Sequence, residues 1–315
     1  MAEIKVDDRF AKPTTLFFGI GAQKAGTSWL HAYLDQHPDV SVPQGKEMHY
    51  WSYLETGYSF HHNRQKDRLE KFSNAKGVLG KLGKANAKLP PFFADYVEMR
   101  ETKDPSHSLY ANNLFDGYTD QKVVGEITPD YSKLSSETFA QMAALNSDTK
   151  FIFVMRDPIE RLHSAMRMRL RGQGNPSRKL GQDEILDALK EVVSTPNAAP
   201  LRRSRYDQTL ASLEAVVAAE KIGYFFYEDI FEKRNVDDVC DFLGIDRRPG
   251  DFDAQVNAGA PKEKEFDPAF RALALAHVGE VYDLMQARFG DRLPAAWKMH
   301  FEGESGPAKV AENVE

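Results

Sequence analysis

Short apolar runs, each closed by glycine, proline or charged residues, recur along the chain and predict buried strands. Residues 16–18, 150–155 and 222–227 are mainly apolar, which is typical of strands covered on both faces of a parallel sheet. Residues 40–43 and 122–127 predict two shorter strands. These runs therefore predict a sheet that is largely hidden from solvent.

Amphipathic segments separate the apolar runs and predict helices. One helix is expected to begin near Trp29, and Pro158 with the acidic residues around it marks a second helix start. Further helices are expected over residues 206–220, 236–243 and 268–289. Strands that alternate with helices predict an α/β fold with a doubly wound parallel sheet flanked by helices, and with helical and loop insertions.

The domain organisation follows from length and from two stretches without a clear pattern. We expect one domain over residues 1–301 and a flexible tail over 302–315. Residues 167–205 are basic and polar with glycine and proline, which fits a mobile lid, a substrate loop or disorder. Residues 64–88 carry eight basic side chains, which fits a solvated helix pair or the recruitment of an anionic molecule.

Composition narrows the class of protein. The formal net charge of −6 over 315 residues argues against a nucleic-acid partner, so any anion site must be local. A single cysteine, Cys240, excludes an internal disulfide and a cysteine-based zinc site. No apolar run approaches the ~20 residues that span a bilayer, and acidic residues stand near the N-terminus where a signal peptide needs basic ones. We therefore expect a cytoplasmic protein without a membrane anchor.

Residues 15–30, TLFFGIGAQKAGTSWL, carry the strongest chemical signal. A strand, a loop with glycines and a helix start form the geometry that binds phosphate-like anions through backbone amides and the helix dipole. Lys24 would add a full positive charge, while Thr27 and Ser28 would add hydroxyl donors. The spacing does not fit a Walker A loop, in which lysine directly follows the second glycine.

Two more clusters stand near expected strand ends. Residues 46–51, KEMHYW, combine two charged groups, a histidine and two aromatic side chains. Arg156 ends the predicted strand 150–155, at the edge of the sheet where open α/β folds bind ligands. Ser164 falls about two helical turns later, so Arg156 and Ser164 together are suited to binding a second phosphate.

Three motifs resemble those of sulfotransferases that use 3′-phosphoadenosine-5′-phosphosulfate (PAPS). Residues 23–29, QKAGTSW, are similar to the 5′-phosphosulfate loop, and Arg156-Asp157-Pro158 with Ser164 is similar to the 3′-phosphate site. Residues 205–207 and 224–230 look like the tyrosine helix and the strand of that family. The resemblance implies a P-loop-like doubly wound fold, with 52–120 and 165–205 as insertions on the acceptor side.

The resemblance also implies a role for each matching residue. Lys24 and the neighbouring backbone amides hold the 5′-phosphosulfate, Arg156 and Ser164 hold the 3′-phosphate, and two aromatic residues contact adenine. A late-loop lysine, Lys262 or Lys264, would complete the 3′-phosphate site. The implied donor-binding residues are Lys24, Ala25, Gly26, Thr27, Ser28, Trp29, Arg156, Ser164 and Tyr206.

Residues 46–51 look like the K-E-P-H-[FY]-[FW] segment of the carbohydrate (heparan-type) branch, with Met48 in place of proline. Glu47 is thereby implied as the base that takes the acceptor proton, and His49 is the second candidate because its ordinary pKa suits base catalysis near neutrality. The G-E-K-T-P match at 125–129 is incomplete, because Ile127 replaces lysine. The implied acceptor is the hydroxyl or amine of a small molecule or glycan, for example a carbohydrate or glycolipid.

The chemistry of in-line sulfuryl transfer fits these residues. A cation at the bridging oxygen stabilises the transition state, a role for Lys24 that requires no metal. A donor anion near Glu47 is expected to raise the pKa of that carboxylate. Two alternatives stay open, a P-loop-type ATP-dependent kinase and a non-catalytic nucleotide-binding protein. The sequence does not specify the acceptor or the oligomeric state.

Overall fold

The computed structural model describes residues 5–43, 45–57, 97–99, 101–102, 104–172, 178–254 and 267–302. Within them, five parallel strands form one sheet in the order β2-β3-β1-β4-β5. The strands are β1 (Thr15–Gly21), β2 (Val40–Ser41), β3 (Val123–Ile127), β4 (Thr149–Met155) and β5 (Ile222–Phe226). The predicted α/β fold with a parallel sheet is confirmed, although the strand expected over residues 40–43 is shorter.

Helices connect the strands and cover the sheet. The α-helices are α1 (Thr27–Asp35), α2 (Tyr50–Thr56), α5 (Ser108–Leu114), α6 (Ser136–Ala143), α7 (Pro158–Gly172), α8 (Gln182–Ser194), α9 (Ala199–Arg202), α10 (Tyr206–Glu214), α11 (Tyr227–Phe231), α12 (Asp237–Leu243), α13 (Pro268–Phe289) and α14 (Ala295–Glu302). The described residues also form four short 3₁₀ helices, η1 (Asp8–Ala11), η2 (Pro129–Lys133), η3 (Ala219–Lys221) and η4 (Gly290–Arg292).

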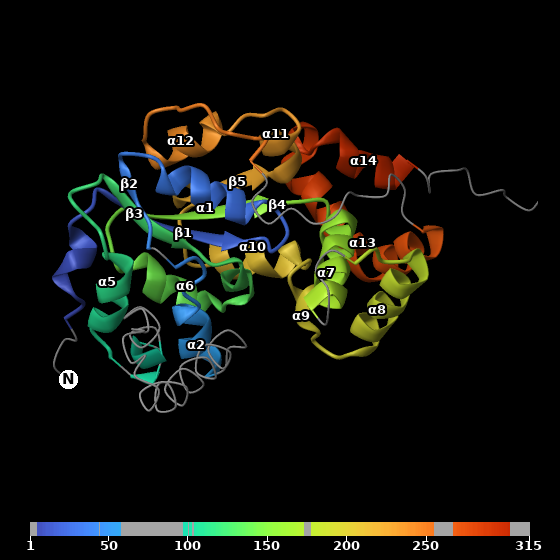
Figure 1. Ribbon diagram of the computed structural model, residues 1–315, viewed down its shortest axis with the longest axis horizontal. Helices are drawn as coiled ribbons and strands as arrows, with labels where there is room; N and C mark the ends of the chain where they lie inside the picture. The colour runs from blue at the N-terminus through green and yellow to red at the C-terminus, as the bar shows by residue number, and fades with distance from the viewer. Residues whose placement is uncertain are drawn as a thin grey trace, which may run out of the picture.

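Figure 1 shows the layers of the molecule, with α1 and α12 on one face of the sheet and α6 and α10 on the other. Helices α7, α8 and α13 pack against one another beside the sheet, next to the end of β4. This arrangement follows from the sequence, because the central strands are apolar on both faces and need cover on both sides. All seven residues of β1 are buried.

The buried core is continuous and includes residues from both ends of the described chain. One cluster of buried hydrophobic side chains extends from Phe10 to Trp297 and contains the strands and the inner faces of the helices. Tyr206 and Phe226 of this cluster pack against Trp297 of α14. The C-terminal helix is therefore part of the same packed body as the sheet.

The interpretation of residues 167–205 as a lid, loop or disordered segment is wrong for most of its length. Helix α7 continues to Gly172, and the described residues from 178 onward form α8 and α9. Ile185, Leu189 and Val192 of α8 are buried at helical spacing. This apolar stripe packs α8 against α7 and α13, so the described part of the segment is helical and packed.

One predicted helix ends early. The helix expected over residues 206–220 stops at Glu214, and the chain then turns through η3 into β5. Val216 and Val217 disfavour helix through their branched side chains, and Val217 is buried at the turn. The predictions for residues 64–88, for Lys262 and Lys264 and for residues 303–315 lie outside the described residues.

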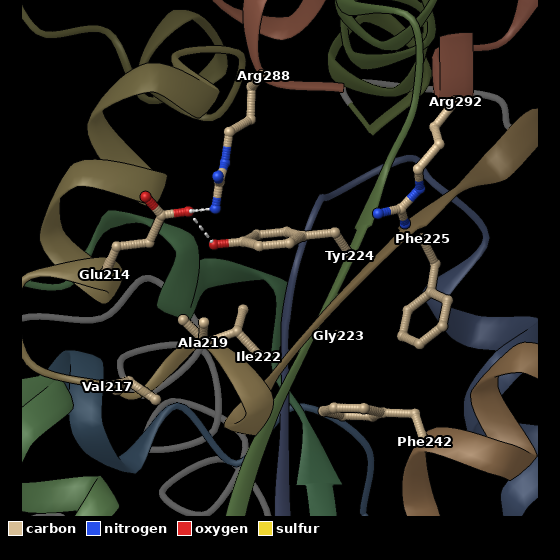
Figure 2. Close-up of a pocket in the computed structure, with 10 residues that line it drawn as sticks. All are labelled: Glu214, Val217, Ala219, Ile222, Gly223, Tyr224, Phe225, Phe242, Arg288 and Arg292. Atoms are coloured by element: carbon tan, nitrogen blue, oxygen red, sulfur yellow. Dashed lines mark hydrogen bonds and ion pairs between the residues drawn. The ribbon is translucent and has the colours of Figure 1, made fainter. Parts of the chain in front are cut away.

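A surface cavity of about 490 Å³ lies beside the edge strand β5 (Figure 2). Glu214 on its rim accepts hydrogen bonds from Tyr224 (2.7 Å) and Arg288 (2.9 Å). Ile222 in its wall pairs with Phe151, the third residue of β4. The cavity therefore lies along most of β5, and it is lined by none of the predicted site residues.

Candidate active site

The predicted anion loop connects β1 to α1. Lys24 (φ 74°) and Gly26 (φ 79°) both have left-handed backbone conformations, and Gly26 directly precedes the first residue of α1. A Cβ atom at Gly26 would lie 2.5 Å from Cζ of Phe231 and closer still to its Cε2. Glycine is therefore required here both by the backbone conformation and by the close approach of α11. The amides of the following residues lie at the start of the helix, where backbone N–H groups have no helical partner.

Lys24 stands in a strongly positive environment. Its side chain is partly buried, and burial, followed by the charges of Arg156, Lys46, Arg167 and Arg171, lowers its pKa. Among the described residues no carboxylate pairs with the Lys24 ammonium group. A partly buried lysine surrounded by other cations is unfavourable unless an anion compensates the charge. The loop is therefore suited to binding a multiply charged anion.

Arg156 reaches the same loop from the end of β4. Its guanidinium group donates to the carbonyl of Lys24 (3.0 Å) and to the carboxylate of Glu160 (2.5 Å), and it lies 4.7 Å from the ring centre of Tyr227. Ser164 is two turns along α7 and partly exposed. The structure thus places Arg156 beside the anion loop, with 6% of its side chain exposed.

The two aromatic residues assigned to adenine are covered by protein. Trp29 is 6% exposed and stacks on Tyr33 (centroid distance 5.5 Å) and Phe252 (4.7 Å). Tyr206 is fully buried, and its hydroxyl donates to the Arg156 carbonyl (2.7 Å). Tyr206 therefore supports the turn that carries Arg156 and presents no exposed ring face in this structure.

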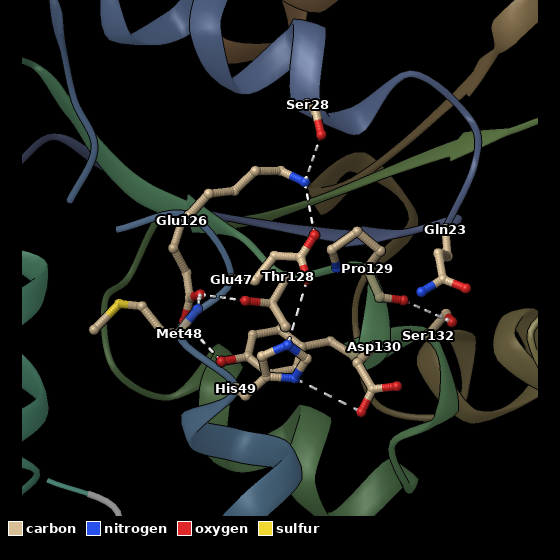
Figure 3. Close-up of polar contacts among 12 residues, drawn as sticks. Gln23, Ser28, Glu47, Met48, His49, Glu126, Thr128, Pro129, Asp130 and Ser132 are labelled. Carbon is tan, nitrogen blue, oxygen red and sulfur yellow. Dashed lines mark hydrogen bonds and ion pairs between the residues drawn. The ribbon is translucent and has the colours of Figure 1, made fainter. Parts of the chain in front are cut away.

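Glu47 and His49 lie beside the anion loop (Figure 3). The ammonium group of Lys46 donates to the hydroxyl of Ser28 (3.0 Å) and to Oε1 of Glu47 (2.7 Å), so one lysine links the loop to the candidate base. His49 Nε2 is 3.4 Å from Oε2 of Glu47. The structure therefore brings together Ser28, Lys46, Glu47 and His49, although Lys46 had no predicted role.

The pKa of Glu47 is lowered in the protein alone. Burial would raise it, but the hydrogen bond from His49 and the charge of Lys46 outweigh burial and lower the pKa to about 2. The expected increase concerns a bound donor anion, so it stays a prediction. In the protein alone Glu47 is ionised at neutral pH.

A second group of charges lies behind His49. Asp130 of η2 pairs with Lys133 (2.6 Å) and Arg203 (2.6 Å), and its Oδ2 is 3.9 Å from Nδ1 of His49. These charges hold the pKa of Asp130 well below its usual range, although burial opposes the shift. Sequence reasoning did not find this group, because η2 and the turn before Tyr206 meet only in the folded chain.

Arg161 is a further residue that the sequence interpretation missed. It is fully buried in α7, and its guanidinium group donates to the hydroxyl of Ser204 (2.7 Å) and to the carbonyl of Pro200. A third, longer contact of 3.5 Å reaches the carbonyl of Gln23 in the anion loop. Arg161 thus connects the α9 region to the anion loop, and no local sequence motif predicts this contact.

These contacts define an enzyme-like site for an anionic substrate, with cations on one side and a carboxylate on the other. Residues 17–249 match a family model described as the sulfotransferase family. The chain therefore belongs to the sulfotransferase family and is a sulfotransferase enzyme. PAPS is the usual donor in this family. No curated protein matches the chain.

A solved structure shows the same fold, and a second one is less similar. A sulfotransferase from Alicyclobacillus acidocaldarius is 23% identical with a TM-score of 0.62, and the match covers 91% of this chain and 99% of that one. The sulfotransferase domain of an olefin synthase from Synechococcus PCC 7002 is 18% identical with a TM-score of 0.47, covering 96% of this chain and 94% of that one. In the part of the chain that the structure describes, no helix is long and apolar enough to cross a membrane.

Proposed function

We propose that this enzyme transfers the sulfuryl group of PAPS to the hydroxyl or amine of a small-molecule or glycan acceptor. The observation that carries the proposal is the environment of Lys24, which is partly buried, surrounded by cations and without a carboxylate partner in the described chain. An anion with several charges, such as a 5′-phosphosulfate, offsets this arrangement. We also propose a cytoplasmic location, and we expect no requirement for a metal.

The donor-binding residues divide by the charge they recognise. Lys24 and the amides of residues 25–28 bind the 5′-phosphosulfate at the start of α1. Arg156 binds the 3′-phosphate together with Ser164: Arg156 contacts the anion loop from the end of β4, and Ser164 follows it two turns along α7. Trp29 contacts the adenine after Phe252 moves aside, and Tyr206 acts by holding Arg156.

The donor supplies a sulfuryl group bound to a good leaving group, and the protein supplies charge and a base. Lys24 neutralises charge that develops on the leaving oxygen. Glu47 accepts the acceptor proton, while His49 orients the carboxylate through their 3.4 Å contact. Lys46 lies between Ser28 and Glu47, so a bound donor competes with Glu47 for this cation. Partial loss of Lys46 would raise the pKa of Glu47 toward values more useful for a base.

The decisive experiment measures which phosphate Arg156 recognises. Calorimetric titration compares PAP, which carries the 3′-phosphate, with 5′-AMP, which lacks it, on the wild type and Arg156→Ala. Loss of a charged hydrogen bond costs about 1.5–3 kcal/mol, or about 10- to 150-fold in Kd. We expect this loss for PAP and little change for 5′-AMP. Arg247→Ala, just beyond α12, whose side chain is 58% exposed, is the matched arginine control.

The other outcomes separate the competing functions. If Arg156→Ala weakens the binding of PAP and of 5′-AMP by the same factor, the guanidinium group does not recognise the 3′-phosphate and that assignment fails. If ATP with magnesium binds better than PAP, the assignment of PAPS as the donor fails. If PAP binds but radiolabelled PAPS transfers to no member of an acceptor panel, and Glu47→Gln changes nothing, a non-catalytic nucleotide-binding role replaces the proposal.

A further inference from the structure

A buried carboxylate lies directly beneath the loop that carries Glu47 and His49. Glu126 is in β3 and has 1% of its surface exposed, and its side chain extends from the strand toward Met48 (Figure 3). Burial raises the pKa of Glu126, and hydrogen bonds oppose this effect. A carboxylate at a fully buried strand position is expensive in free energy compared with an apolar residue of similar size. Its presence there therefore calls for a specific reason.

Four donors from three parts of the chain converge on this carboxylate. Oε1 accepts from the hydroxyls of Tyr110 (2.7 Å) and Tyr131 (2.8 Å). Oε2 accepts from the hydroxyl of Thr128 (2.6 Å) and from the backbone amide of Met48 (3.2 Å). Because a carboxylate has about four acceptor positions, these donors satisfy it completely in its ionised form. The Met48 amide is the donor that comes from the candidate base loop.

The loop needs such an anchor because its backbone is strained. Glu47 (φ 66°) and His49 (φ 52°) have left-handed conformations that L side chains rarely adopt, and neither is glycine. They flank Met48, whose side chain is fully buried. Strained residues of this kind persist only where the surroundings fix them. The bond between Met48 and Glu126 lies between the two strained positions.

We propose that Glu126 is a positioning residue that fixes the backbone of residues 47–49 through the Met48 amide. In this arrangement Glu47 faces Lys46 and His49 faces Asp130, which are the partners the structure gives them. Glu126 contacts none of the anion-loop side chains in the interactions described; besides the Met48 amide it holds Thr128 and Tyr131, on either side of Asp130. The effect of Glu126 on catalysis rests on the proposed function, in which Glu47 is the base. The anchoring of the Met48 amide rests on the structure alone.

Amide hydrogen exchange in the peptide that spans residues 45–50 tests the anchor directly. Glu126→Met keeps the length of the side chain and removes both acceptor oxygens, whereas Gln can keep its carbonyl on the Met48 amide and donate to the two tyrosine hydroxyls. We expect at least tenfold faster exchange at Met48 in Glu126→Met, with the amides of β1 and β4 unchanged. Tyr110→Phe is the matched control, since it removes one donor from the same carboxylate without touching the Met48 bond.

Function is measured in the same variants. PAP affinity in Glu126→Met should stay within about twofold of the wild type. The kcat for transfer from PAPS, measured with a member of the acceptor panel that the wild type sulfates, should fall at least 30-fold with unchanged donor KM. Unchanged exchange at Met48 in Glu126→Met would overturn the proposal. Equally fast exchange at Met48 in Tyr110→Phe would show that Glu126 acts only through general core stability and would also overturn the proposal. Failure of the wild type to bind PAP would refute the proposed function and leave the exchange result standing.

Discussion

Gly26 offers a quantitative test of the anion loop, because alanine there breaks two separate constraints. The left-handed backbone at φ 79° costs an L residue about 1–2 kcal/mol. The added methyl would also lie 2.5 Å from Cζ of Phe231 and closer still to Cε2, an overpacking that typically costs about 1–3 kcal/mol. We therefore expect Gly26→Ala to lower the free energy of unfolding by about 2–5 kcal/mol and to weaken PAP binding.

Urea denaturation of two further variants separates the constraints. Gly117 has nearly the same conformation (φ 82°), and among the described residues no atom lies within 4 Å of the point where an added methyl would stand, so Gly117→Ala should lose only about 1–2 kcal/mol. Phe231→Ala combined with Gly26→Ala should recover part of the packing cost. Equal destabilisation by Gly26→Ala and Gly117→Ala would show that α11 does not press on the loop and would refute this reasoning.

The remaining predictions concern the charges of the site. Glu47→Gln should reduce turnover by about 10²–10⁴-fold, measured by steady-state kinetics, with PAP affinity retained. Since the pKa of Glu47 is lowered to about 2, its ionised form stabilises the fold above about pH 4.5, and this contribution, on the order of 2–3 kcal/mol, is lost as the pH falls. Lys46→Met should make the dependence of unfolding free energy on pH shallower between pH 5 and 2, because the pKa of Glu47 returns toward its ordinary value. Asp130→Asn should cost on the order of 2–4 kcal/mol in urea denaturation, because two partly buried cations lose their partner, whereas exposed Asp241→Asn should cost less than about 1 kcal/mol.

The anion loop could be predicted because its determinants are local. A buried strand, the glycines and the helix start all lie within residues 15–30, and their backbone conformations follow from short-range sterics. The position of Arg156 could be predicted in the same way, since a parallel strand followed by Pro158 fixes where the chain leaves the sheet. The fold class follows from the same alternation of strands and helices.

The rest depends on contacts between distant segments. Lys46 and Ser28 are 18 residues apart, Asp130 and Arg203 are 73 apart, and only the folded chain brings them together. The lowered pKa of Glu47 comes from His49 and Lys46 of its own segment, but the geometry that brings both onto the carboxylate exists only in the folded chain. Helix α8 was a different kind of error, since its apolar stripe was present but the glycine and proline before it dominated the interpretation.

The coverage of Trp29 gives the protein an optical signal of its own. The chain has three tryptophans, and Trp51 and Trp297 are fully buried in the core. Trp29 differs, because its indole N–H donates to the carbonyl of Asp251 (2.7 Å) and its ring stacks on Phe252. A ligand that displaces this short segment changes the polarity around one indole and leaves the other two untouched. Emission from Trp29 would then report occupancy of the site in real time, without a label and before any acceptor is known.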